Sequence, residues 1–97
     1  MGLKTTTFDP AATIETPEDV AYFLEAAFEG ADAAHIARAL GIVARSRGMT
    51  ALADKTGLSR QALYKALGDS GNPSLDTLLK VFEALGLRLS VKLAETA

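Results

Sequence analysis

A polar run near the middle of the chain, residues 59–65, contains side chains that could contact DNA. Arginine can form two hydrogen bonds with guanine, and glutamine can do the same with adenine, so we predict that Arg60 and Gln61 read bases. Basic side chains and hydroxyls are better suited to phosphates, and we expect those contacts from Arg45, Arg47, Thr50 and Lys65. The complete predicted DNA-binding set is Arg45, Arg47, Thr50, Ser59, Arg60, Gln61, Tyr64 and Lys65.

These side chains need a rigid support, and residues 50–67 predict two short helices joined by a turn. Gly57 stands where the turn requires a positive φ, and Ser59 can cap the second helix. Leu58 and Leu63 are placed to hold both helices over a shared core. The pattern is typical of a helix-turn-helix, whose second helix lies in the DNA major groove. The alternative is an ordinary helical hairpin whose surface Arg and Lys serve solubility.

The net charge of −2 conceals a strong asymmetry along the chain. Residues 1–37 contain one lysine against seven acids, a balance of −6. Residues 38–67 contain six basic residues against one acid, a balance of +5, and residues 68–97 come to −1. Local charge sets the potential that a phosphate backbone meets. Because the basic segment coincides with the candidate helix-turn-helix, it favours DNA binding over a merely solvated surface.

Helical periodicity and capping residues predict an all-α domain of five helices. Thr16 and Pro17 mark the start of the first helix. Gly41, inside the second, costs about 1 kcal/mol relative to alanine and indicates close packing or a kink. The predicted inward face of the fifth helix, which starts at Ser74, is Leu75, Leu78, Leu79, Phe82 and Leu85. The chain divides into an N-terminal arm (1–15), a helical domain (16–86) and a C-terminal segment (87–97).

The C-terminal segment predicts a short β-strand. Residues 87–93 alternate strictly, with the apolar set Leu87, Leu89, Val91 and Leu93 on one face. An unpaired strand edge is a liability, so we expect pairing with the same strand of a second copy, giving a homodimer. The competing partner is the N-terminal arm around residues 4–8.

Composition argues against several classes of protein. Ninety-seven residues, 48% of them hydrophobic, suit one domain with a modest core. No cysteine and a single histidine leave no disulfide framework and no zinc site. There is no membrane-spanning run of about 20 apolar residues and no signal-peptide core. We therefore expect a cytoplasmic protein without metal, cofactor, membrane partner or enzymatic activity.

Several segments, taken in order, resemble the addiction-module antidote proteins, which are HigA-like antitoxins with a lambda-repressor or Cro-type helix-turn-helix. The resemblance rests on Phe8-Asp9-Pro10, the acidic helix from Thr16, and residues 42–49, 56–67, 71–74 and 85–89. It implies a five-helix lambda-repressor-like fold and a type II antitoxin. Such a protein neutralises a RelE/HigB-like, mRNA-cleaving toxin and binds its own operator as a dimeric repressor. The alternatives are a stand-alone regulator of the same fold and a helical interaction module that never meets DNA.

The acidic first third of the chain suits a basic partner. RNA-cleaving toxins are generally basic, and complementary charge would steer and select one. The predicted toxin contacts are Glu15, Glu18, Asp19, Glu25 and Glu29. The alternative is that these acids only cap and solvate a helix, since Glu18 and Asp19 lie where the helix dipole favours negative charge.

Overall fold

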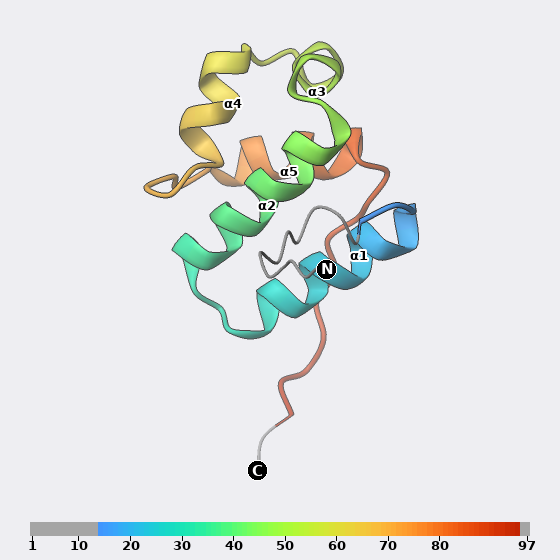
Figure 1. Cartoon of the computed structure of the whole chain (residues 1–97). Coiled ribbons are helices and arrows are strands. Elements are labelled where there is room, and N and C mark those ends of the chain that lie inside the picture. Colours follow the sequence, from blue (N-terminus) through green and yellow to red (C-terminus); the bar gives the residue numbers. More distant parts are fainter. Residues whose placement is uncertain (1–13, 96–97) are drawn as a thin grey trace, which may run out of the picture.

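The computed structural model describes residues 14–95, in which the chain forms five α-helices and no strand. The helices are α1 (Pro17–Glu29), α2 (Ala33–Arg47), α3 (Met49–Thr56), α4 (Arg60–Ala66) and α5 (Leu75–Ala84). In Figure 1, α3 and α4 form one end of the molecule, and the C-terminal segment leaves at the opposite end. Most of the predicted arm, residues 1–13, lies outside the described residues. None of the five helices has both the length and the apolar character needed to cross a membrane.

Capping side chains fix where the helices begin. Thr16 accepts a hydrogen bond from the Asp19 backbone N–H, and the Asp19 carboxylate accepts one from the Thr16 N–H, which is a capping box. Ser74 likewise accepts from the Thr77 N–H at the start of α5. Asp32 occupies the N-cap position of α2 but makes no side-chain capping bond. The helix starts predicted at Thr16 and Ser74 are confirmed.

The core lies between α2 and the helices around it. Leu40 and Val43 of α2 and Leu63 of α4 are completely buried. Gly41 faces the carbonyl oxygen of Leu67, which lies so close that a Cβ atom on Gly41 would overlap with it. Of the two alternatives that the sequence left open at Gly41, the structure therefore supports close packing.

The predicted inward face of α5 is partly wrong. Leu75 and Leu79 are 65% and 49% exposed, whereas Val81 and Phe82 are buried. The Phe82 ring packs edge-on against Phe28 of α1, with ring centroids 5.9 Å apart. Val81 and Phe82 thus lie on the side of α5 that faces the core, and the two rings adopt the edge-to-face arrangement that aromatic pairs favour. Leu75 and Leu79 then point away.

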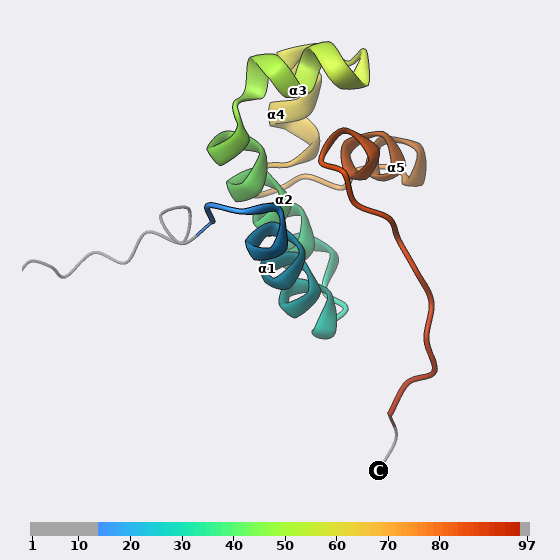
Figure 2. The ribbon, with the colours of Figure 1, turned by 90° about the vertical axis from the view of Figure 1, so that its right-hand side faces the viewer.

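The predicted C-terminal strand is also wrong for the single chain, because residues 87–95 form no strand. Leu87 donates a backbone hydrogen bond of 2.8 Å to the Phe82 carbonyl, and Leu87 and Leu89 pack half-buried against the core. Beyond them the chain leaves the domain (Figure 2). A strand needs a hydrogen-bonded neighbour, and residues 14–95 provide none. The competing partner around residues 4–8 lies outside the described residues.

Candidate nucleic-acid interface

A rigid turn joins α3 to α4, and we call residues 49–66 the α3–α4 hairpin. Gly57 ends α3 in the left-handed region (φ 77°), and its N–H donates to the Ala53 carbonyl at 2.9 Å. The Thr56 hydroxyl donates to the Leu52 carbonyl (2.8 Å) and accepts from the Leu58 N–H (3.2 Å). Sequence reasoning missed Thr56, although a threonine directly before a helix-ending glycine is the available signal. Its hydroxyl ties the end of α3 to the turn.

The start of α4 is fixed in the same local manner. The Ser59 hydroxyl accepts from the Ala62 N–H at 2.9 Å, as predicted. Leu63 is completely buried and Leu58 half-buried, so both leucines anchor the hairpin to the core. With its N-terminus capped and one side buried, α4 presents its remaining side chains in a defined direction.

The exposed surface of α4 brings four of the predicted DNA-binding residues together. Arg60, Gln61, Tyr64 and Lys65 are all exposed. The Arg60 guanidinium lies 5.8 Å from the centre of the Tyr64 ring, within cation–π distance. This contact orients the guanidinium along the helix toward Tyr64, one turn further on. The arrangement provides hydrogen-bond donors and an amide on one exposed helical surface, the chemistry that base edges and phosphates require.

The other predicted phosphate contacts are more dispersed. Thr50 is exposed in the first turn of α3. The exposed Arg45 has its guanidinium beside Gly41, where the Leu67 carbonyl at the end of α4 also approaches. Arg47, by contrast, donates a hydrogen bond of 3.2 Å to the Thr16 carbonyl at the start of α1. The structure therefore links Arg47 to α1 rather than to α4.

The predicted toxin contacts divide into structural and free acids. The Asp19 carboxylate accepts from the backbone N–H groups of Glu15 (3.0 Å) and Thr16 (3.1 Å), and these bonds lower its pKa. Asp19 is thus committed to the start of α1. Glu15 and, along α1, Glu18, Glu25 and Glu29 are exposed, as is Tyr22 (79%). Because Glu18, Tyr22, Glu25 and Glu29 recur every three or four residues, they form one continuous stripe, the α1 acidic stripe.

Similarity to known proteins covers both the hairpin and α1. The model of a family described as "Probable addiction module antidote protein" matches residues 4–93. A protein of Haemophilus influenzae, described as uncharacterized, is 38% identical over 85 residues, which cover 88% of this chain and 88% of that protein. No solved structure matches. Because the family model spans nearly all of the sequence, from the N-terminal residues through α5 and beyond, the chain belongs to the family of probable addiction module antidote proteins.

Proposed function

We propose that the protein is the antitoxin of a type II toxin–antitoxin system and represses its own operon as a homodimer. Membership of the antidote family supports a regulator that acts by binding a toxin, without catalysis. The α3–α4 hairpin would act as the helix-turn-helix of a lambda-repressor-like domain. The observation that carries the DNA-binding part is the capped, core-anchored α4 with Arg60 and Gln61 exposed at its start. Operator DNA and toxin would both be met in the cytoplasm.

DNA binding is tested by gel shift with a duplex from the region upstream of the protein's own gene. Wild type should bind this duplex more tightly than a random one, because base contacts add to the phosphate contacts. Arg60→Ala and Gln61→Ala should each weaken specific binding by about 1–3 kcal/mol. Arg38→Ala, which removes an exposed arginine of α2 outside the hairpin, is the matched control. Equal affinity of wild type for both duplexes would exclude sequence-specific recognition.

The proposal that the protein binds a toxin rests on its family and on the negative charge of the α1 acidic stripe. We expect a basic, RelE/HigB-like partner that contacts the α1 acidic stripe and Glu15. Asp19 supports this surface by capping α1 rather than by meeting the toxin. Co-expression with the neighbouring gene, followed by co-purification in moderate salt, tests the partner. If no small basic protein is encoded beside this gene and none co-purifies, a stand-alone regulator becomes the better description.

A further inference from the structure

The first half of the C-terminal tail, residues 87–95, packs against the domain, and its second half is exposed. Leu87 and Leu89 turn toward the core, whereas Val91 and Leu93 are 99% and 92% exposed. Within the described part of the chain, the last backbone hydrogen bond of this region is the one donated by Leu87. The strand-like alternation of apolar residues therefore continues past the point where the domain can bury them.

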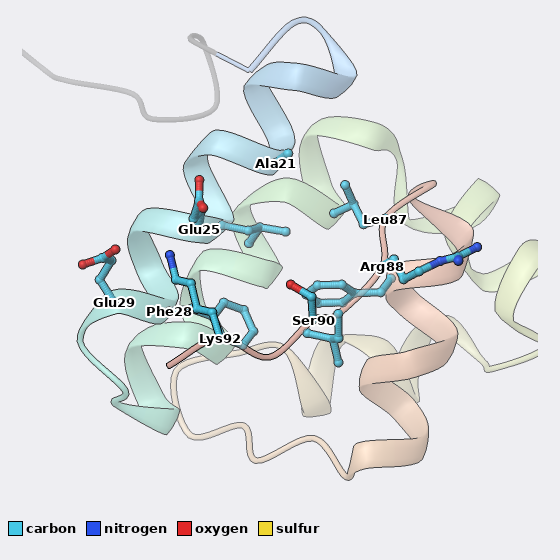
Figure 3. Close-up of a pocket in the computed structure, with 11 residues that line it drawn as sticks. Ala21, Glu25, Phe28, Glu29, Leu87, Arg88, Ser90 and Lys92 are labelled. Atoms are coloured by element: carbon cyan, nitrogen blue, oxygen red, sulfur yellow. The ribbon is translucent and has the colours of Figure 1, made fainter. Parts of the chain in front are cut away.

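An apolar groove of about 380 Å³ lies between the tail and α1 (Figure 3). Its apolar lining comes from Leu24 and Phe28 of α1 together with Phe82 and two tail leucines, Leu87 and Leu89. Polar side chains line the rest, namely Glu25, Glu29, Arg88, Ser90 and Lys92. Leu89, which lines the groove, lies two residues before the exposed Val91. An open apolar groove and two exposed apolar side chains in one chain are complementary halves of a self-association surface.

We propose that the tails of two copies pair as an antiparallel ribbon centred on Val91. Pairing would bond the backbone N–H and C=O groups of alternate tail residues to the partner subunit and cover part of the exposed half of the tail. This interface specifies the homodimer of the proposed function and rests on that part of it. The tail interface would form without DNA and without a toxin. α4 lies at the opposite end of the molecule (Figure 1), so the ribbon leaves it uncovered.

Charge selects the register. In a twofold antiparallel pair only the residue on the axis faces its own copy, and like charges directly opposite are destabilising. An axis at Lys92 would set two lysines opposite each other, and an axis at Ser90 would set Arg88 opposite the partner's Lys92. An axis at Val91 instead pairs Val91 with itself and Ser90 with the partner's Lys92.

The remaining register has its axis at Leu89. It would leave fewer residues able to pair, because its pairs include residues that cannot adopt strand geometry. It would place Leu93 opposite Leu85 of the partner subunit, which has helical dihedral angles at the C-cap of α5. It would also extend the pairing into Gly86, whose positive φ (76°) is incompatible with a strand. The axis at Val91 keeps the pairing within the extended tail.

The register with its axis at Val91 also explains what would cover the groove. Directly opposite residues of an antiparallel pair share one face, so Leu93 of the partner subunit would lie beside Leu89. Leu89 itself lines the groove, together with its tail neighbours Arg88, Ser90 and Lys92. Each copy would therefore cover the other's groove with Leu93, as a twofold interface requires.

Single cysteines test the register, because the chain has no cysteine of its own. Directly opposite residues bring two Cα atoms to about 4.5–5.5 Å, within the range that a disulfide accepts. Val91→Cys should form a disulfide-linked dimer under mild oxidation, roughly tenfold faster than Lys92→Cys, which meets Ser90 rather than itself. Equal or absent crosslinking of both variants would overturn the proposal.

Two further variants separate the interface from the rest of the function. Val91→Asp with Leu93→Asp should give a folded monomer by light scattering, since both side chains are exposed in the single chain. Ser90→Asp should tighten the dimer roughly two- to tenfold by facing Lys92 of the partner subunit. A wild-type dimer unaffected by the double variant would overturn the tail interface while leaving the homodimer intact. A wild-type monomer at tens of micromolar would overturn both, and toxin binding would remain to be judged separately.

Discussion

Gly41 shows how one missing side chain sets the distance between two helices. Alanine is the better helix former, so Gly41→Ala would ordinarily stabilise α2 by about 1 kcal/mol. Here the added Cβ would overlap with the Leu67 carbonyl that closes α4. We therefore expect a net destabilisation of about 1–3 kcal/mol, the usual cost of overpacking, measured by urea unfolding. Gly30→Ala is the control, because a Cβ there meets nothing within 4 Å. Equal stability of both variants would contradict the close approach.

Asp19 makes the stability of α1 depend on pH. Its pKa is lowered below the ordinary value of 3.8 by the backbone N–H groups of Glu15 and Thr16, by the Thr16 hydroxyl and by the nearby Arg47. A carboxyl whose folded-state pKa is depressed contributes stability above its unfolded pKa and loses it as pH falls through the folded pKa. The urea midpoint of wild type should therefore exceed that of Asp19→Ala at pH 7, and the difference should shrink below pH 3.8. A pH-independent difference would mean that the charge of Asp19 contributes nothing.

At the scale of the element, most local signals could be predicted from the sequence, although the hydrogen bonds of Thr56 were missed and Asp32 makes no capping bond. Non-local contacts could not be predicted. The caps at Thr16, Ser59 and Ser74 and the left-handed stop at Gly57 involve neighbours within a few residues, and all were predicted correctly. The inward face of α5 depends on Phe28, more than fifty residues earlier, so its leucine-rich pattern was ambiguous.

The residues of the candidate nucleic-acid interface also divide into those positioned by local contacts and those positioned by distant ones. The α4 surface follows from its own cap and period, and its four exposed residues were predicted. The position of Arg47 depends on the carbonyl of Thr16, which is 31 residues away. The tail had the alternation of a strand, but alternation reports only which residues share a face. A strand also needs a neighbour, which the single described chain does not contain.

The turn between α3 and α4 gives a prediction about the hairpin as a unit. Thr56→Val keeps the shape of the side chain but removes the hydroxyl that bonds the Leu52 carbonyl and the Leu58 N–H. The loss of two hydrogen bonds should destabilise the protein by about 1–2 kcal/mol. A looser turn should also weaken operator binding, although Thr56 itself need not touch DNA. Thr56→Ser, which restores the hydroxyl, should recover both stability and gel-shift affinity; failure to recover would exclude the hydroxyl as the cause.

For the whole molecule, charge is divided between two surfaces of opposite sign that the net value of −2 conceals. The basic residues of α4 and the α1 acidic stripe lie on different helices, each anchored to the core by its own leucines, Leu63 and Leu24. A phosphate backbone and a basic protein would therefore be drawn to different parts of one small domain. Two partners could then be held at once, and each could be lost without the other.

The charge of the α1 acidic stripe can be changed without altering α4, because the two lie on different helices. Replacing both Glu18 and Glu25 with Gln should slow association with a basic toxin roughly two- to tenfold at low salt, because exposed charges act mainly on the association rate. The difference should fade as added salt shortens the screening length. Operator binding should be unchanged, whereas Arg60→Ala should weaken operator binding and leave toxin association intact. Surface plasmon resonance at two ionic strengths measures both. If the double variant associates at the wild-type rate in low salt, the α1 acidic stripe does not steer the toxin.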